Sequence, residues 1–173
     1  MIVSEDNMTK SQDWYFRVNE YCQTISETYN VPLIKVAGIM SALSPKNTFA
    51  SNVKSLEAFI RTKGNCKVST YNGQKIKALT ILNSPDSITI DEVKKILGGL
   101  KTMAFFDNML RPETSQDVTI DLWMIRHFDI KGSLTPKRYK DASNKIKDLA
   151  KELNLLPHQV QAKLWVDIRG NAW

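Results

Sequence analysis

Two neighbouring stretches of the chain decide its fold: residues 96–106 read ILGGLKTMAFF, and residues 118–126 read VTIDLWMIR. In the first stretch, the pair Gly98 and Gly99 separates two apolar helical patterns and predicts a sharp turn between helices. In the second stretch, Asp121 stands directly before an apolar helical pattern, where aspartate is a favoured N-cap. Together they predict a helix, a glycine turn, a second helix and an approach to a third helix that opens at an aspartate.

Helical periodicity extends from these stretches over the whole chain, because apolar residues recur at spacings of three and four. Prolines, glycines and capping residues mark the boundaries, as in Thr89 followed by Glu92, a capping-box pair. Ile76, Leu79 and Leu82 are expected on the inner face of their helix. The pattern predicts eight or so short helices and no convincing strand, with expected ranges of about 11–29, 33–43, 48–64, 76–82, 89–96, 101–110, 121–128, 135–153 and 157–168. The expected fold class is therefore all-α.

Length and composition set broad limits on the protein. A chain of 173 residues, with 42% hydrophobic and 24% charged residues, predicts a single globular domain over residues 1–173. Residues 1–10 are polar and acidic, and no apolar stretch is long enough for a bilayer, so a cytoplasmic protein without a membrane anchor is expected.

Cys22 and Cys66 are isolated, and His127 and His158 lack accompanying ligands, so neither a metal nor another cofactor is expected. Trp14, Trp123 and Trp165 are expected in the core.

The chain is basic, with 24 Lys and Arg against 18 Asp and Glu and a net charge of +6. A positive excess favours polyanionic partners such as DNA. We expect this excess to gather at the mouth of a cleft, supplied by Lys46, Lys54, Lys75, Lys94 and Lys95.

Lys101 and Asp121 are the residues that can carry chemistry. Nucleophilic attack by an amine needs its unprotonated form, which the positive end of a helix dipole favours, and a nearby carboxylate can accept the proton. Lys101 is expected in the first turn of its helix, and Asp121 could be that carboxylate. The alternative readings are a lysine that points into solvent and an aspartate that only caps its helix.

At these residues the sequence resembles the helix-hairpin-helix DNA glycosylase superfamily, the endonuclease III type in particular. Gly98, Gly99 and Lys101 match the hairpin and its catalytic lysine, and Asp121 matches the catalytic aspartate, with a gap close to the family's. Further similarity lies in 36–54, 71–75 and 163–170. The resemblance implies a compact, two-lobed helical domain with Lys101 and Asp121 facing one cleft, within about one water of each other.

The resemblance also implies which residues contact DNA, namely Gly98, Gly99, Ser44, Lys46, Asn47, Lys54 and Lys75. Where the family has a glutamine wedge that fills the gap left by an extruded base, this chain offers Leu43, Ser44 or Asn47. Its hairpin order is Leu97-Gly98-Gly99, whereas the family places glycines on either side of one apolar residue. The four C-terminal cysteines that hold an iron–sulfur cluster in part of the family are missing. The block Lys101-x-x-x-Phe105-Phe106-x-Asn108 and the block Asp121-Leu122-Trp123 are also similar to small bacteriophage proteins of the same superfamily. The resemblance therefore implies a small, divergent, bacteriophage-type member, which would act in the host cytoplasm.

The expected function is that of a DNA N-glycosylase with AP-lyase capability, acting as a monomer on a flipped-out or single-stranded nucleotide. Two alternatives stay open. One is a phage-type enzyme that modifies a thymine or another pyrimidine base in DNA without excising it. The other is a non-catalytic domain that binds DNA or protein.

Overall fold

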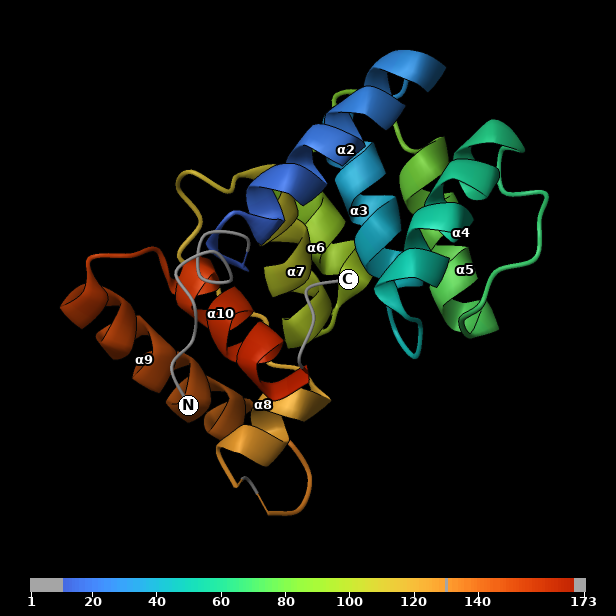
Figure 1. The fold of residues 1–173 in the computed structure, drawn as a ribbon. Helices are drawn as coiled ribbons and strands as arrows, with labels where there is room; N and C mark the ends of the chain where they lie inside the picture. The colour runs from blue at the N-terminus through green and yellow to red at the C-terminus, as the bar shows by residue number, and fades with distance from the viewer. Residues whose placement is uncertain (1–10, 130, 170–173) are drawn as a thin grey trace.

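The structure is a computed structural model that describes residues 11–129 and 131–169, without the side chains of Leu122, Trp123, Ile168 and Arg169. The expectations for residues 1–10 and for the side chains of Trp123 and Ile168 lie outside this part. The described residues form helices and no strand, which confirms the all-α prediction (Figure 1). The helices are α2 (Trp14–Tyr29), α3 (Leu33–Leu43), α4 (Phe49–Arg61), α5 (Asn72–Asn83), α6 (Ile90–Leu97), α7 (Leu100–Leu110), α8 (Leu122–His127), α9 (Pro136–Leu153) and α10 (Pro157–Arg169).

The helix ends follow local capping chemistry. Thr48 Oγ1 accepts a hydrogen bond from the backbone N–H of Ser51 at the start of α4, and Thr89 and Glu92 form the predicted capping box at the start of α6. Gly98 ends α6 in the left-handed conformation, with φ of 71°, and Gly99 directly precedes α7. The predicted glycine turn between two helices is therefore confirmed.

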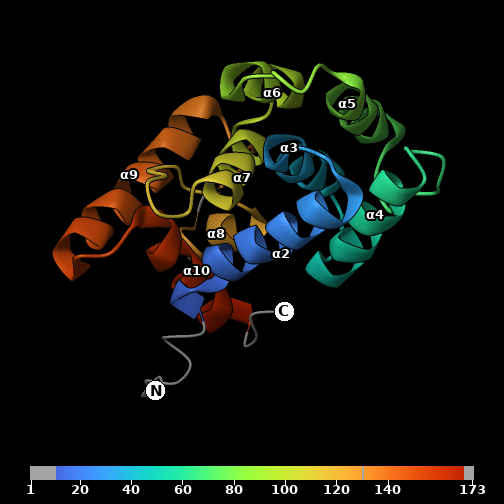
Figure 2. The same cartoon turned by 90° about the horizontal axis from the view of Figure 1, so that it is seen from above.

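Helix α3 is the centre of a first group of helices, which we call the first lobe (α2 to α7). It packs against α2, α4, α5, α6 and α7, and all its residues from Val36 to Leu43 are buried. A Cβ atom on Gly38 would lie 2.9 Å from Val93 Cγ1 of α6, so only glycine allows these helices to approach so closely. Figure 2 shows α3 enclosed by its neighbours, as expected for a nearly all-apolar helix.

A second group of helices, α8 to α10, has a hydrophobic core of its own and forms the second lobe. Val118 and Ile120, from the extended segment before α8, pack with Met124, Tyr139 and Ile146. Both ribbon views show this lobe on the side of the molecule opposite to α4 and α5 (Figures 1 and 2).

The predicted inner face of α5 is wrong for Ile76, whereas Leu79 and Leu82 pack against the core. Ile76 is 55% exposed, and Leu79 and Leu82 are only partly buried, whereas Ala78 and Ile81 are fully buried. The helix also begins earlier than expected, at Asn72. Helix α5 packs along α3, and the side of α5 that contains the small Ala78 is the side that faces α3. The side that contains Ile76 therefore stays exposed. Leu153, expected on the inner face of α9, is also exposed.

No helix in the described ranges is both long enough and apolar enough to cross a membrane.

Candidate functional site

A pocket of about 520 Å³ lies between the two lobes, and its size is in the range typical of small-molecule and cofactor sites. The first lobe contributes the starts of α2, α4 and α7 and the loop between α3 and α4, while the second lobe contributes the segment before α8 and one face of α10. The lining residues are Trp14, Tyr15, Ser44, Lys46, Asn47, Thr48, Phe49, Asn52, Lys101, Phe105, Thr119, Asp121, Gln161, Ala162 and Trp165. Lys101 and Asp121 therefore line the same pocket, together with residues that are distant from both in sequence.

Aromatic side chains form much of the pocket lining. The Trp14 ring centroid lies 4.9 Å from that of Phe49, 6.2 Å from that of Phe105 and 5.8 Å from that of Trp165. Trp14 belongs to the core as predicted, but Trp165 is only partly buried and faces the pocket. Flat apolar walls of this kind suit a flat ligand such as an aromatic heterocycle.

The carboxylate of Asp121 is held by two donors. Its Oδ1 accepts a hydrogen bond of 3.0 Å from the backbone N–H of Met124, so the predicted N-cap of α8 is confirmed. Its Oδ2 accepts a hydrogen bond of 2.9 Å from the indole N–H of Trp165 on α10. The orientation of this carboxylate therefore depends on both α8 and α10.

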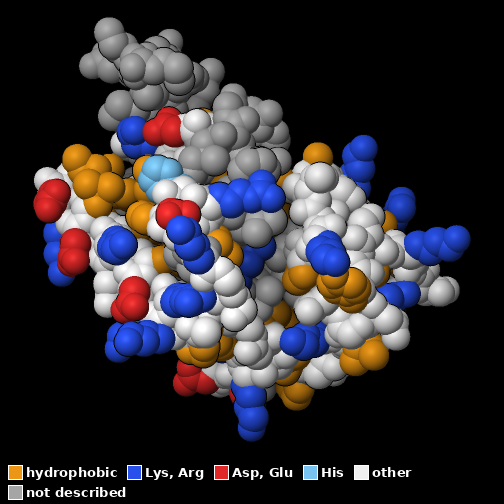
Figure 3. Space-filling view, turned by 90° about the horizontal axis from the view of Figure 1, so that it is seen from below, with side chains coloured by type: hydrophobic (Ala, Val, Ile, Leu, Met, Phe, Trp, Pro, Cys, Tyr) orange, Lys and Arg blue, Asp and Glu red, His pale blue; other side chains and the backbone are white. Residues whose placement is uncertain are grey.

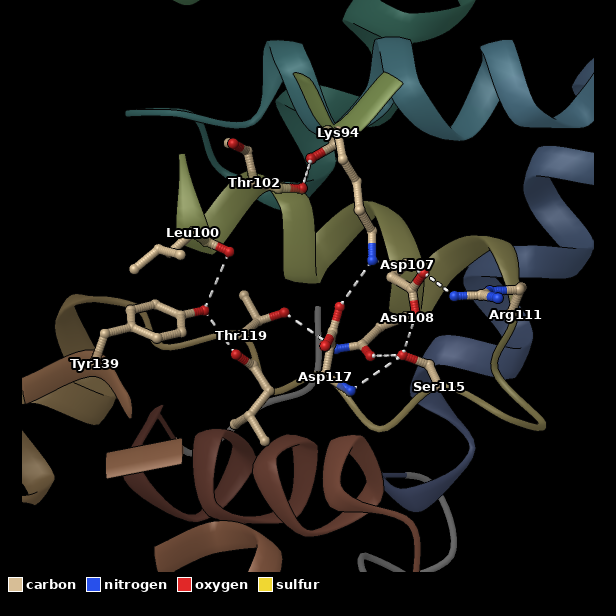
Figure 4. A network of polar contacts seen from close by, with 12 residues as sticks. Lys94, Leu100, Thr102, Asp107, Asn108, Arg111, Ser115, Asp117, Thr119 and Tyr139 are labelled. Carbon is tan, nitrogen blue, oxygen red and sulfur yellow. Dashed lines mark hydrogen bonds and ion pairs between the residues drawn. The ribbon is translucent and has the colours of Figure 1, made fainter. Parts of the chain in front are cut away.

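A network of polar contacts positions the segment that leads to Asp121 (Figure 4). Lys94 Nζ lies 3.1 Å from Asp107 Oδ1 and 3.3 Å from Asp117 Oδ2, and Asn108 Nδ2 donates to Thr119 Oγ1 over 3.2 Å. Ser115 Oγ lies 2.7 Å from Asp107 Oδ2 and 2.7 Å from Asn108 Oδ1. These ion pairs and hydrogen bonds hold the segment against α6 and α7, the helices on either side of the glycine turn.

Tyr139 of α9, in the second lobe, also forms hydrogen bonds with this segment. Its hydroxyl donates to the carbonyl of Val118 over 2.7 Å and accepts from the backbone N–H of Ile120 over 3.2 Å. Burial raises the pKa of Tyr139 to about 12, so the phenol keeps the proton that it donates. Contacts from both lobes therefore fix the backbone on which Asp121 stands.

Lys101 occupies the second position of α7 and is half-buried on the wall of the pocket. Its helix is fixed against α3 by a hydrogen bond of 2.7 Å from Ser41 Oγ to the carbonyl of Thr102. Among the ion pairs between described residues, none joins Lys101 to Asp121. The two residues therefore share the pocket without forming an ion pair with each other.

The residues expected to contact DNA divide into two groups. Ser44, Lys46 and Asn47 line the pocket. The glycine turn at 98–99 and the two lysines Lys54 and Lys75 do not line it; Gly98, Gly99 and Lys54 are exposed elsewhere.

Lys75, one of the expected DNA contacts, and Leu43, one of the wedge candidates, both contact other parts of the protein. The ammonium of Lys75 donates to the carbonyl of Cys66 over 2.6 Å, so it is engaged within the protein. Leu43, offered as a wedge, is fully buried beneath the loop because it completes the inner face of α3, and it cannot reach a ligand.

The positive charge gathers on the first lobe, in a region that includes Lys46, Lys54 and Lys75 but not Lys94 or Lys95. Residues 44–83 hold seven Lys and Arg and one acidic residue, Glu57, an excess of six that equals the net charge of +6 of the whole chain. Figure 3 shows Lys and Arg without Asp or Glu over α4 and α5, and acidic side chains on the opposite half of the same hollowed face. Lys94 instead pairs with Asp107 and Asp117, and Lys95 faces a separate pocket beside α6. The expectation that these two lysines lie at the cleft mouth is therefore wrong.

The histidines and cysteines are placed as structural residues. His158 is fully buried, with its Nε2 2.6 Å from the carbonyl of Pro112, and His127 is exposed. Cys22 and Cys66 are free thiols. Within the described ranges, no group of three or more His, Cys, Asp or Glu is placed to hold a metal ion.

Sequence reasoning missed most of the pocket lining. Trp14, Phe49 and Phe105 continue apolar helical faces, and the pattern does not distinguish a residue in the core from one that borders a cavity. Asn52 and Gln161 could have been noticed in the sequence, because each is a polar amide on or beside an otherwise apolar helix face. Both are almost fully buried in the structure.

Comparison with known proteins adds a family but no activity. No curated protein and no solved structure matches the chain. One family model, described as "Family of unknown function (DUF7178)", matches residues 2–172. The chain therefore belongs to the family of unknown function DUF7178.

Proposed function

We propose that the protein is a DNA N-glycosylase of the helix-hairpin-helix, endonuclease III-like type, with AP-lyase capability on a flipped-out or single-stranded nucleotide. The observation that carries this proposal is one pocket between two helical lobes, in which aromatic walls accompany a lysine and a carboxylate. A helix, a glycine turn, the helix of Lys101 and the helix opened by Asp121 follow one another along the chain in the order of the resembled family. The basic face over α4 and α5 adds an electrostatic reason for DNA as the partner.

In the proposed reaction, a nucleotide enters the pocket with its base between the aromatic side chains. The neutral amine of Lys101 attacks C1′, the bond between C1′ and the base breaks, and the base leaves with that electron pair. Asp121 stabilises the positive charge that develops at C1′ and accepts the proton released from the attacking amine. The bond between C1′ and the ring oxygen O4′ then breaks, O4′ takes the proton that Asp121 accepted, and the nitrogen of Lys101 forms a protonated imine with C1′. From this imine a C2′ proton and the 3′ phosphate can be eliminated.

The test is borohydride trapping on DNA that contains an abasic site. The amine of Lys101 and the C1′ aldehyde of the sugar form an imine with loss of water, and hydride from borohydride reduces it to a stable amine. We expect a covalent protein–DNA product with the wild type and none with Lys101→Ala. Lys95→Ala is the matched control, because Lys95 is exposed on the preceding helix and does not line this pocket.

Stability separates loss of the nucleophile from loss of the fold. Lys101 is half-buried at a helix start and alanine is a better helix former, so the melting temperature of Lys101→Ala should stay close to that of the wild type. Wild-type protein that binds DNA but never traps an abasic site would contradict the lyase mechanism. That result would favour a base-modifying enzyme or a non-catalytic binding domain.

A further inference from the structure

Two primary amides face the pocket with one end tied to the protein and the other end without a protein partner. Asn52, on α4, is only 2% exposed, and its Nδ2 donates to the carbonyl of Met40 on α3 over 3.0 Å. Its Oδ1 has no hydrogen-bond partner among the described residues. A buried, unpartnered carbonyl oxygen is costly, and a ligand N–H is the natural group to satisfy it.

Gln161, on α10, lies in the opposite wall and is 5% exposed. Tyr15 has one hydroxyl proton but two neighbours, Gln161 Oε1 at 2.9 Å and Thr119 Oγ1 at 3.0 Å. Because the amide oxygen can only accept while the threonine hydroxyl can also donate, the Tyr15 proton goes to Gln161 and the hydroxyl of Thr119 donates to Tyr15.

In this arrangement Oε1 is the end of the Gln161 amide that bonds within the protein. Burial raises the pKa of Tyr15, so the phenol stays protonated and keeps Oε1 of Gln161 as its acceptor. Nε2 of Gln161 is then the free end, and no described residue accepts a hydrogen bond from it. The pocket lining therefore contains one unpartnered acceptor, the buried Oδ1 of Asn52, and one amide donor, Nε2 of Gln161.

We propose that Asn52 and Gln161 read the edge of an intact nucleobase, with Asn52 Oδ1 accepting from a base N–H and Gln161 Nε2 donating to a base carbonyl or ring nitrogen. This inference rests on the proposed function and adds that the ligand is recognised through its base, before any glycosidic bond is broken. A sugar or a phosphate would offer no flat surface to the aromatic walls, and a purely apolar ring would leave both amide ends unpaired. Tyr15 acts as a positioning residue, because its hydroxyl bonds to the Gln161 amide and so orients it.

The test uses free 2′-deoxynucleosides, which need neither DNA binding nor catalysis. Trp14 and Trp165 line the pocket, so a stacked base should quench tryptophan fluorescence. We expect at least one of the four nucleosides to quench in a saturable way at millimolar concentration. For the nucleoside that binds most tightly, the counterpart with every base N–H replaced by N-methyl should bind about tenfold more weakly or worse, because the buried oxygen of Asn52 is left unpaired.

Variants assign the effect to the two amides. Gln161→Met keeps the size of the side chain and should weaken nucleoside binding about tenfold, while Gln116→Met, an exposed glutamine outside the pocket, should change nothing. Tyr15→Phe should reduce the preference of the wild type for the unmethylated base, because the Gln161 amide is then free to turn. A role of Tyr15 in stability alone would lower the melting temperature without changing that preference.

The inference is overturned if no nucleoside binds, if N-methylation leaves the affinity unchanged, or if Gln161→Met binds like the wild type. An abasic site has no base, so trapping on abasic DNA does not depend on the two amides. Trapping without nucleoside binding would remove this inference and keep the lyase, whereas nucleoside binding without trapping would do the reverse.

Discussion

Asp121 accepts hydrogen bonds on both carboxylate oxygens, from the backbone N–H of Met124 and from the indole N–H of Trp165. An aspartate that only caps a helix needs one of these donors. The second bond comes from α10, fixes the carboxylate plane and leaves the charge facing the pocket that the residue lines. At this residue a capping role and a role in stabilising a developing cation are compatible.

Asp121→Asn separates the two roles. An asparagine oxygen can still accept from Met124, but its amino group then faces the indole N–H of Trp165, another donor, so a modest loss of melting temperature is expected. Activity on the correct DNA substrate should drop about 100-fold or more, because the negative charge is gone. The measurements are single-turnover rates and melting curves of both proteins.

The double variant Asp121→Asn with Trp165→Phe provides the control. Phenylalanine removes the opposing donor, so the double variant should recover stability without recovering activity. Full activity of either variant would reduce Asp121 to a helix cap.

His158 should make the protein less stable in mild acid. Burial lowers the pKa of His158, although its hydrogen bond to the Pro112 carbonyl opposes the shift. The folded state keeps this ring neutral, whereas the unfolded chain binds a proton below about pH 6.5. Stability from this group is therefore present above about pH 6.5 and is lost as the pH falls toward the lowered folded-state pKa.

The measurement for His158 is the urea midpoint between about pH 8 and about pH 5.5, a window above the range in which carboxylates titrate. The midpoint should fall with pH in the wild type. His158→Gln, which can donate to the same carbonyl, should flatten this dependence, and His127→Gln, at an exposed position, should leave it intact. An equal slope in wild type and His158→Gln would exclude His158 as the cause.

At the scale of the elements, the segment between α7 and α8 is a loop whose geometry is set by its anchors. Asp107 is at the centre of these anchors, in contact with Lys94, Arg111 and Ser115. Burial alone would raise the pKa of Asp107, but hydrogen bonds from Ser115, Arg111 and Lys94 outweigh it and lower the pKa. The charged carboxylate thus ties α6, α7 and the segment together.

Ser115→Ala tests this anchoring. Ser115 is buried, and its single hydroxyl proton lies between two acceptors, Asp107 Oδ2 and Asn108 Oδ1. Its loss leaves a buried acceptor without a donor, which costs about 1–3 kcal/mol in the free energy of unfolding and several degrees in melting temperature. Because the same segment carries Asp121, the reaction rate should fall as well, although Ser115 does not line the pocket. Thr114→Ala is the control, since Thr114 is exposed. A rate that stays at the wild-type value would mean that Asp121 is positioned by α8 and α10 alone.

At the scale of the whole molecule, the excess positive charge lies on one side of the protein. The rest of the chain outside residues 44–83 is electrically balanced, so the field that attracts a polyanion comes from α4, α5 and their connection. This face adjoins the pocket through Lys46, whose ammonium lies 4.9 Å from the ring centroid of the exposed Tyr71. DNA bound there would pass directly beside the pocket mouth.

Neutralising this face should weaken DNA binding and its dependence on salt. The triple variant of Lys54, Arg61 and Lys67 to alanine removes three exposed charges, so the log–log slope of affinity against salt should become shallower by up to roughly 0.7–0.9 for each lost phosphate contact. The matched control replaces three exposed lysines of α9, namely Lys137, Lys140 and Lys145. Equal losses in both triple variants would show that binding follows net charge rather than this face.

Local sequence determined most of the secondary structure. The capping pair Thr89 and Glu92, the glycine turn at Gly98 and the N-cap Asp121 all act within one turn of the chain, and the structure has each of them as predicted. Lys101 could be singled out for the same reason, because its place near a helix start follows from the glycine turn before it. The all-α fold class followed from periodicity alone.

The burial and the contacts of these side chains were determined only by the tertiary structure. Ile76 is exposed and Ala78 buried because α3 selects the face of α5, and Lys94 is an anchor for Asp107 and Asp117 rather than part of a cleft mouth. The pocket joins residues from both ends of the chain, and the Asn52 and Gln161 amides acquire free ends only through partners on other helices. Such contacts depend on the packing of whole helices, whereas periodicity and capping report only on neighbours within a few residues along the chain.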